Sequence, residues 1–546
     1  MKNQDHKPNR RDFLRSSAAF AAGSSALGAL AGCATEENDT LSAQSAALVR
    51  SGDAPRLIEP CAAFYAVFQS HNQKVVSNRH GIFLSYLHHQ APDFDANEWR
   101  LLWSKDGGQT FTVLAQGTDA TNPPLLETDA DGNLYLVVSH FAGAPPFFGT
   151  LYRFLAAHHY KHPTRTPFAP LSAPPNQSSV GKWAMVYHRA LHRLHVLDGL
   201  GRLWTLDEQG QTLASQVLFD PSSTNESITN RVFEYPHLAL DELGGLHVAW
   251  TTQDEGPAPA LYSDIRYMRS FDQGQTWRRM DGTIETVPGP AGQLGDGIVA
   301  AGEIGHGTWL ASFRARHGKL HFFYQYAPLG QTHYVRYDLA SGQNRLDLLA
   351  PAFNLFGLDG FFAARSSEPG TPLYCVGTAN DGSGRIACLS SDDEGATWYD
   401  YALLAAVAAP QSCETGASVF AMIPYSVGGA REISGDGRIF GTFMDNVFPY
   451  DPKNGVANHF PVYFFEIQAG IAQAQGTRTF VANHRVRIDF SAVRGQPQSV
   501  RFRRGGNGFD PWRPFDKEIL MLPAHAPDGF QLRSSLGVIS PLYPLA

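Results

Sequence analysis

Three octapeptides of one pattern, Ser-x-Asp-x-Gly-x-Thr followed by an aromatic residue, are the strongest constraint on the fold of this chain. They occupy residues 104–111, 270–277 and 391–398. Their starts lie 166 and 121 residues apart, which divides into three and two units of about 55 to 60 residues. The spacing predicts a chain of repeated β units in which the intervening copies have lost the pattern.

Each octapeptide is suited to a tight turn. The Asp carboxylate and the Ser and Thr hydroxyls can form hydrogen bonds with backbone N–H groups of the turn, and the Gly permits a backbone conformation that other residues avoid. The closing aromatic side chain is expected to pack beneath the unit. We therefore expect these segments to hold hairpins together, and we assign them no catalytic role.

The pattern resembles the Asp-box of the BNR repeats found in sialidases and related β-propellers. The resemblance implies an all-β fold, a seven-bladed β-propeller with BNR/Asp-box repeats. Composition favours the same class, because 52 Gly and 35 Pro with only 17% charged residues suit many short strands joined by turns better than long helices.

Strand-like runs fill the intervals between the octapeptides. They lie at residues 82–86, 134–139, 194–197, 246–250, 309–313, 320–326, 373–376, 386–389 and 462–467. We expect the propeller to span residues 58–475. Residues 476–546 contain further strand-like segments that are expected to close the ring or to flank it.

The N-terminal segment resembles an export signal. A pair of arginines at residues 10–11 precedes a short stretch of small apolar residues, as in twin-arginine signals. The stretch ends in Leu-Ala-Gly-Cys, which looks like a lipobox with Cys33 as the acylated residue. Residues 1–33 are then the signal and 34–57 a flexible tether, and we expect a lipid-anchored protein in the periplasm or at the cell surface.

Export to an oxidising compartment allows disulfides among the four remaining cysteines. Cys375 and Cys388 flank an Asp-Gly turn signal and are expected to face each other across a hairpin, so we predict a bridge between them. Cys61 and Cys413 are a second candidate pair. Buried free thiols are the alternative at both places. The absence of a C-x-x-C pair argues against a thiolate metal site.

The charge balance excludes some partners. A net charge of −8 offers no global basic surface for nucleic acid. Histidines gather at residues 158–162 and 188–195 and could ligate zinc, although the first group sits in a loop beside Pro163 and the second has mixed spacing along a turn and a strand. The sequence indicates no required cofactor and leaves room for a structural calcium or zinc ion. We expect a monomer whose only membrane contact is the N-terminal lipid.

The first candidate site residues are His71 and Asn72, followed by a strand and the pair His88 and His89. This arrangement resembles the His-Asn opening and second His of ulvan-lyase-type polysaccharide lyases, which are propellers of the same superfamily. The resemblance covers about twenty residues and implies that His71 is the catalytic base. The alternative is that His71 caps a turn and that His88 and His89 end a strand near water.

The second segment is Glu-Tyr-Pro-His at residues 234–237, which resembles the Tyr-Pro blade opening of the same superfamily. In the lyases an Arg follows that Tyr by about one hairpin, whereas this chain has Thr251. Another blade must then supply the cation, or the chain is not that kind of lyase. The candidates are Arg266, Arg269, Arg314, Arg316 and Arg365.

Cleavage of a uronate-containing chain by β-elimination explains why these residue types would be grouped. A cation neutralises the carboxylate, a base removes the C5 proton and an acid protonates the leaving O4. We assign His71 as base, Tyr235 as acid and Arg266 or Arg314 as neutraliser. The expected substrate-binding residues are Asn72, His88, His89, Tyr187, His237 and Arg314.

Two other classes of function remain open. Sialidases share the Asp-boxes, but no Arg-Ile-Pro opening precedes the first blade here. A non-catalytic surface lipoprotein that binds glycans through aromatic side chains is the third class. The 9 Trp, 20 Tyr and 35 Phe residues do not separate the classes, because blade cores account for most of them. The sequence favours an exported lyase that acts on an acidic, ulvan-like polysaccharide.

Overall fold

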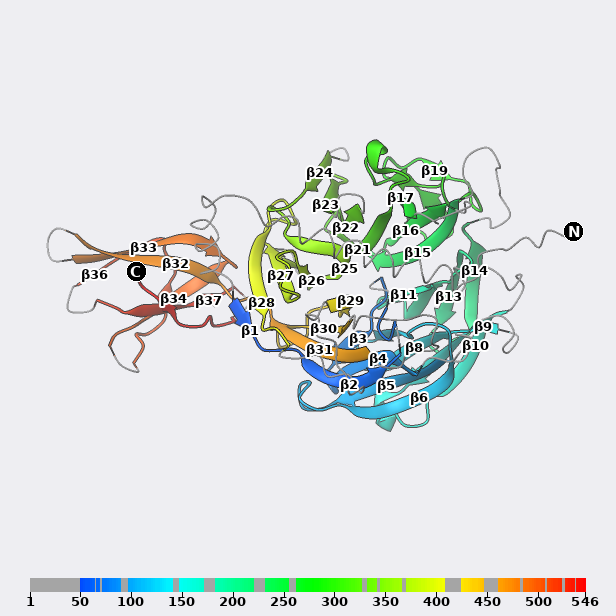
Figure 1. Ribbon diagram of the computed structural model, residues 1–546, viewed down its shortest axis with the longest axis horizontal. Coiled ribbons are helices and arrows are strands. Elements are labelled where there is room, and N and C mark those ends of the chain that lie inside the picture. The colour runs from blue at the N-terminus through cyan, green and yellow to red at the C-terminus, as the bar shows by residue number, and fades with distance from the viewer. Residues whose placement is uncertain are drawn as a thin grey trace, which may run out of the picture.

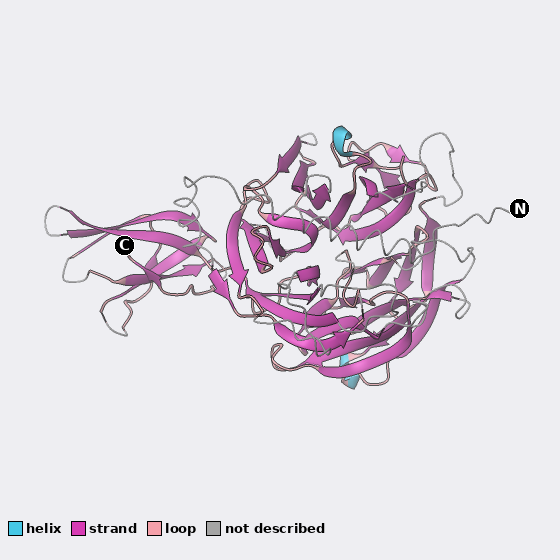
Figure 2. Cartoon of the chain, viewed as in Figure 1, coloured by secondary structure: helices cyan, strands magenta, loops and turns pink. Residues whose placement is uncertain are grey.

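The protein is described by a computed structural model. It covers residues 50–63, 65–68, 71–89, 97–140, 147–170, 182–219, 231–254, 262–326, 331–340, 344–365, 370–407, 424–445, 460–481, 485–505, 508–522, 526–535 and 537–546. Nearly all regular structure in these ranges is strand (Figure 2), apart from the short 3-10 turns η1 (Ala156–His158) and η2 (Ala301–Glu303). None of their helices is long and apolar enough to cross a membrane. The predicted all-β class is confirmed.

The sheets follow one another along the chain, and their main strands pair in sequence order. The first three sheets consist of β3 (Val75–Asn78), β4 (Gly81–His89), β5 (Asn97–Ser104) and β6 (Thr112–Ala120); β7 (Leu125–Thr128), β8 (Leu134–Ser139), β9 (Phe147–Phe154) and β10 (Thr164–Pro170); and β11 (Ala184–His188), β12 (Arg193–Leu197), β13 (Arg202–Asp207) and β14 (Thr212–Val217).

The next three sheets are longer or carry an added strand. They consist of β15 (Arg231–Leu240), β16 (Leu246–Asp254), β17 (Tyr262–Ser270), β18 (Trp277–Arg278), β19 (Ile284–Glu285) and β20 (Asp296–Gly297); β21 (Thr308–Arg316), β22 (Lys319–Tyr326), β23 (Gln331–Asp338) and β24 (Asn344–Leu348); and β25 (Leu355–Ala363), β26 (Leu373–Ala379), β27 (Ile386–Ser391) and β28 (Tyr399–Leu404), with β1 (Arg50–Gly52) parallel to β28.

An early strand completes the last sheet of this series. It consists of β29 (Pro424–Gly429), β30 (Arg438–Asp445), β31 (Phe460–Gln468) and, antiparallel to β31, β2 (Arg56–Ala62). The first strand of each sheet contacts the first strand of the next, and β29 contacts β3 in turn. The sheets therefore form a ring around an axis lined by their first strands (Figure 1).

Neighbouring sheets pack face to face, which is why many strands are buried on both sides. The strands β8, β26 and β27 are buried at every residue. Side chains of the second and third sheets form one apolar cluster in which Tyr135 and Tyr187 stack with ring centroids 5.2 Å apart. Such strands appear in the sequence as continuous apolar runs instead of alternating ones.

The three octapeptides adopt one hydrogen-bonding pattern. Each connects the third strand of its sheet to the fourth, in the first, fourth and sixth sheets of the series. In the first, Asp106 accepts bonds from the backbone N–H and the hydroxyl of Thr110, at 2.9 and 2.6 Å, and Ser104 accepts one from Gly108 N–H at 2.7 Å. The same bonds recur around Asp272 and Asp393. These sheets are three and two steps apart along the series, which matches the spacing of the octapeptides in the sequence.

The C-terminal residues form a separate lobe beside the ring (Figure 1). One sheet contains β32 (Gln473–Val481), β33 (Arg485–Arg494) and β36 (Glu518–Met521), and the other contains β34 (Pro497–Arg503), β35 (Arg513–Pro514), β37 (Gly529–Ser534) and β38 (Tyr543–Pro544). An apolar cluster that includes Phe490, Phe502 and Phe530 lies between them. These strands flank the ring, and β2 completes its last sheet.

Two sequence expectations concern the N-terminal region. The signal and lipidated Cys33 lie outside the described residues, as does most of the expected tether at residues 34–57. Its last part is not a tether, because β1 and the start of β2 lie in sheets. The apolar character of Leu57 and Ile58, which pack against the neighbouring cores, is the sequence signal for that strand.

The predicted bridge between Cys375 and Cys388 is wrong, since both are buried free thiols. Cys375 faces Leu389 across the hairpin, and Cys388 faces Val376. The register therefore differs by one residue from the expected one, which places the two thiols on opposite faces of the sheet and in different apolar clusters. Cys61 is disulfide-bonded. Cys413, its candidate partner in the sequence, lies outside the described residues.

Candidate functional site

The structure brings four of the sequence-predicted site residues together at the ring axis. The ring centroid of His71 lies 5.7 Å from that of Tyr235 and 5.3 Å from that of His237. Asn72 is adjacent in sequence and donates its side-chain amide to the carbonyl of Trp183. We call His71, Asn72, Tyr235 and His237, with Lys182, Glu234 and Tyr262, the axial cluster.

A bulge in β15 places Tyr235 in this cluster. The pairing of β15 with β16 shifts between Glu234 and His237, so that one extra residue stands on the β15 side. Tyr235 has a φ of 46°, and Pro236, which cannot donate a ladder hydrogen bond, lies within the irregular part. The Tyr-Pro pair of the sequence therefore marks the place where the strand leaves its regular register.

Lys182 is the cation of the axial cluster. Its Nζ lies 4.2 Å from the centroid of the Tyr235 ring and forms an ion pair with Glu234. The Lys182 side chain is 7% exposed and that of Glu234 is fully buried. Tyr262 donates a hydrogen bond of 3.3 Å to the Tyr235 hydroxyl, and Trp309 packs on the Tyr235 ring at 4.2 Å.

The electrostatic environment holds the two central groups in complementary protonation states. Burial, with the nearby His237, Lys74 and Lys182, lowers the pKa of His71 well below its usual value, although a hydrogen bond to the Trp183 backbone opposes the shift. Burial first, and then Tyr262 and Glu234, raise the pKa of Tyr235 well above its usual value. Near neutral pH the imidazole is therefore uncharged and the phenol protonated.

One ring nitrogen of His71 is available to accept a proton. Its Nε2 is buried and has no hydrogen-bond partner in the part of the chain that the structure describes. A buried polar atom without a partner is destabilising. Further such atoms occur among the described residues, for example Nε2 of His195 and of His321, so it is the position of Nε2 of His71 beside Tyr235 that points to a function. The free lone pair of a neutral imidazole is what a general base requires.

A second group of polar residues lies deeper along the axis. Arg431, which follows β29, donates to the carbonyls of Leu238 at 3.1 Å and Met185 at 2.9 Å and forms an ion pair with Glu127. Its backbone N–H donates to Gln73 at 2.9 Å. One arginine therefore ties together first strands or adjoining segments of five sheets.

Beyond Arg431 lies a cavity of about 610 Å³ at the C-terminal ends of the first strands. Charged residues are prominent in its lining, which includes Glu127, Arg189, Asp241, Glu242, Arg314, Arg431 and Glu432. The sequence-predicted Tyr187 and Arg314 both line it. Arg314 donates to the carbonyl of Arg431 at 2.7 Å and to the Glu432 carboxylate at 3.0 Å, so its charge is used at this end.

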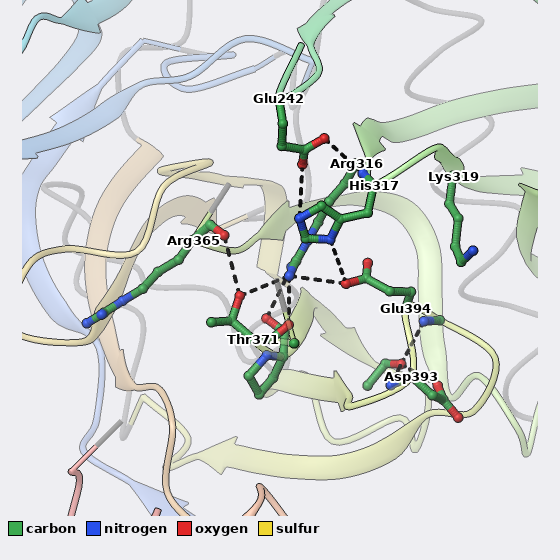
Figure 3. A network of polar contacts seen from close by, with 12 residues as sticks. Glu242, Arg316, His317, Lys319, Arg365, Thr371, Asp393 and Glu394 are labelled. Carbon is green, nitrogen blue, oxygen red and sulfur yellow. Dashed lines mark hydrogen bonds and ion pairs between the residues drawn. The ribbon is translucent and has the colours of Figure 1, made fainter. Parts of the chain in front are cut away.

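An ion-pair network joins neighbouring sheets close to the same end (Figure 3). The ring of His317 lies between Glu242, at 3.5 Å, and Glu394, at 3.0 Å. The Arg316 side chain is fully buried and contacts Glu394 at 3.2 Å and the Thr371 carbonyl at 2.7 Å. Because Glu394 lies inside the third octapeptide, the repeated turn also connects its sheet to the preceding one.

Three other predicted residues are placed apart from the axial cluster. Arg266, on the third strand of its sheet, pairs with Asp264 at 3.0 Å and donates to the carbonyls of residues 293–295. His88 contacts Glu59 at 3.2 Å, and His89 is the exposed last residue of β4. The geometry therefore does not support Arg266 as the carboxylate neutraliser.

Sequence reasoning missed Lys182, Lys74 and Arg431. Each is a basic residue within two positions of an apolar strand or a Gly-Gly pair, where burial is expected to exclude charge. A basic residue in such apolar surroundings was the signal in the sequence by which these three could have been found. The histidine groups were left open as metal sites, and the described residues contain no group of three or more His, Cys, Asp or Glu suited to hold a metal.

Comparisons with known proteins find only distant similarity. No family model and no curated protein sequence matches the chain. Solved structures with a similar arrangement include the polysaccharide lyase Uly1, at 12% identity and a TM-score of 0.48 over 77% of this chain and 100% of that chain. A PL25 ulvan lyase bound to -[GlcA(1-4)Rha3S]- has 10% identity and a TM-score of 0.47 over 74% and 94%.

Proteins with other roles match at a similar level of identity. YCF48 from Cyanidioschyzon merolae has 11% identity and a TM-score of 0.36 over 75% of this chain and 98% of that chain. Similarities of this size assign neither a family nor an activity to the chain.

Proposed function

We propose that the chain is an exported polysaccharide lyase that cleaves a uronate-containing, ulvan-like polysaccharide by β-elimination in the axial cluster. The observation that carries the proposal is the uncharged, unpartnered Nε2 of His71 beside the protonated Tyr235 and the cation Lys182. In this proposal the ring of sheets is a seven-bladed β-propeller with Asp-box repeats, and its axis brings together residues from distant blades.

The reaction uses three groups of the axial cluster. Lys182 attracts the substrate carboxylate, which acidifies the neighbouring C5 proton. Nε2 of His71 accepts that proton as the bond between O4 and C4 breaks, and the Tyr235 hydroxyl protonates the leaving oxygen. The products are an unsaturated uronate end and a new hydroxyl end. In this proposal Lys182, and not Arg266 or Arg314, neutralises the substrate carboxylate.

Substrate binding also tunes the base. In the free protein, Lys74, Lys182 and His237 all disfavour a proton on His71. A bound carboxylate reverses part of this effect, because an opposite charge within a few ångströms favours the protonated imidazole. The pKa of His71 therefore rises toward the working pH when substrate is present, which is where a general base is most effective.

The remaining parts of the proposal concern location and partners. We propose export by the twin-arginine route with Cys33 as the lipid-anchored residue, in the periplasm or at the cell surface. The protein acts as a monomer on an acidic polysaccharide and requires no cofactor. Labelling with a radioactive fatty acid, present in the full chain and lost in Cys33→Ala, tests the anchor.

Ultraviolet absorbance tests the reaction class. On a panel of uronate polysaccharides, a lyase raises the absorbance through its unsaturated product, a hydrolase releases reducing ends without that rise, and a binding protein does neither. We expect His71→Ala to lower the rate by about a thousandfold, which is typical for loss of a general base. The circular dichroism spectrum should stay unchanged. Full activity of this variant would contradict the mechanism.

A further inference from the structure

The C-terminal lobe has a charge opposite to that of the rest of the chain. Residues 473–546 contain ten Lys or Arg against five Asp or Glu, a net charge of +5, in a chain whose total is −8. The other residues contain 33 Lys or Arg and 46 Asp or Glu. Such a local excess of positive charge favours an anionic partner for the lobe.

Strand alternation concentrates part of this charge on one face. In β34 the side chains of Val500 and Phe502 are buried, and Arg501 and Arg503 point outward. In β37 the neighbouring Arg533 also points outward. Ser499 pairs with Arg533 and Arg501 with Gln531, so Arg501 and Arg533 are diagonal neighbours on the outer face of this sheet.

Aromatic side chains hold these two arginines in place. The Arg501 guanidinium carbon lies 4.6 Å from the centroid of the Trp512 ring, and that of Arg533 lies 4.3 Å from it. Arg501 also stacks on Phe509 at 4.3 Å. Stacking preorganises the planar guanidinium groups, which lowers the entropy that a ligand must overcome. We call Arg501, Arg503, Arg533, Phe509 and Trp512 the arginine face.

The charge at the centre of this face is not neutralised by the described residues. Arg503 pairs with Asp528 and Arg504 with Asp510. Arg501 donates to the neutral amide oxygen of Gln531, at 2.9 and 2.6 Å. Over the described ranges of the lobe, neither Arg501 nor Arg533 forms an ion pair with a carboxylate.

We propose that the arginine face binds an acidic polysaccharide through its carboxylate or sulfate groups. Guanidinium forks match both oxyanions in geometry, and the aromatic rings offer apolar contact to the sugar rings between the charges. Binding here needs no chemistry at His71. The inference shares its substrate class with the proposed function, but it predicts an interaction that persists when cleavage is abolished.

The test measures binding of the full-length protein to ulvan, with neutral dextran as the reference polymer. We compare the protein with an unaltered C-terminal lobe with Arg501→Gln/Arg533→Gln and with Arg485→Gln/Arg487→Gln. The second pair removes the same charge from the outer face of β33, on the other sheet. All proteins carry His71→Ala, so that the polymer stays intact.

We expect the Arg501/Arg533 variant to bind ulvan about tenfold or more weakly, because glutamine cannot replace the charge-assisted hydrogen bonds that the guanidinium groups donate. The Arg485/Arg487 control should stay within about twofold, and dextran should not bind. If circular dichroism shows that the double variant is unfolded, the single variant Arg533→Gln replaces it in the binding measurement.

Three results would overturn the proposal. They are an equal loss in the control variant, binding of dextran as strong as that of ulvan, or arginine-dependent binding to phosphatidylglycerol vesicles without binding to ulvan. The last would assign the face to an anionic membrane. Failure of the lyase assay with ulvan binding intact would reject the proposed function alone, which keeps the two proposals distinguishable.

Discussion

The two ends of the ring axis use buried polar groups in different ways. The axial cluster lies around Tyr235 and the segments before β3 and β11, and contains one ion pair among aromatic rings. The cavity end, where the first strands finish, contains several ion pairs that reach between sheets. Both ends are built from residues far apart in sequence.

The difference separates a site organised for proton transfer from one organised for stability. At the cavity end Arg314, Arg316 and Arg431 each have a carboxylate and a carbonyl as partners, so their charges are compensated, although Nε of Arg314 has no partner among the described residues. In the axial cluster the unpartnered atom is an imidazole nitrogen, which can accept a proton. An unsatisfied buried atom lowers the stability of the fold, and a catalytic role is one reason why it is retained.

Arg431→Gln should give the largest loss of stability. The change leaves the partly buried carboxylate of Glu127 without its ion pair and removes the long donor shared by the carbonyls of Met185 and Leu238. Breaking a fully buried pair costs about 3–5 kcal/mol, and for this partly buried pair we expect about 3 kcal/mol. Urea-induced unfolding measures the effect.

A matched control separates this role from charge removal alone. Arg345 is similarly exposed but pairs with Asp347 on its own strand. Loss of such a surface pair costs less than about 1 kcal/mol. Equal losses of unfolding free energy in Arg345→Gln and Arg431→Gln would show that the position of Arg431 between several sheets adds nothing to stability.

Tyr235→Phe tests the other end, with activity as the main readout. The phenyl ring keeps its packing on Trp309, but the acid that protonates the leaving oxygen is lost. We expect kcat to fall about a hundredfold or more. Tyr262→Phe, which removes only the neighbouring donor, should have a smaller effect. A larger loss in Tyr262→Phe would transfer the role of acid to Tyr262.

The fold could be predicted from the sequence because the octapeptides report on local physics. Their hydrogen bonds run between residues at most four positions apart, so the pattern and its spacing are sufficient to infer the turns and the repeat. The register of the hairpin at Cys375 could not be inferred in this way. A shift of one residue leaves the turn signal unchanged and reverses the face on which each thiol lies.

The candidate site was predictable only where a motif marks it. His71 and Tyr235 belong to recognisable segments, and the structure brings them together. Lys182 was missed because no motif surrounds it and its role follows from the position of β11 beside β15. Arg266 looked equally suitable in the sequence, since its hydrogen bonds to the carbonyls of residues 293–295 depend on a loop return that has no local signal.

Glu394→Gln should have an intermediate effect at the cavity end. The buried guanidinium of Arg316 loses its carboxylate, although the carbonyl and hydroxyl of Thr371 remain as acceptors. We expect a loss of about 2 kcal/mol in the free energy of unfolding. Asp338→Asn, which breaks the more exposed pair with Lys319, is the control. If both variants lose the same free energy of unfolding, the network around Arg316 and Glu394 makes no special contribution to stability.

The smallest expected effect is the pH dependence that His237 gives to the axial end. Burial lowers its pKa to about 3, whereas the unfolded side chain titrates near 6.5. Below 6.5 the unfolded chain therefore binds a proton that the folded protein does not, and stability falls as the pH falls. At pH 5.5 this amounts to about 1.4 kcal/mol relative to pH 8. In His237→Asn the free energy of unfolding should therefore change less between these two pH values, by that amount. His192→Asn, which removes an exposed imidazole, is the control.

Parallel curves of unfolding free energy against pH for the wild type and His237→Asn would show that His237 takes up its proton inside the folded ring. The axial end would then differ less from the cavity end than its burial indicates.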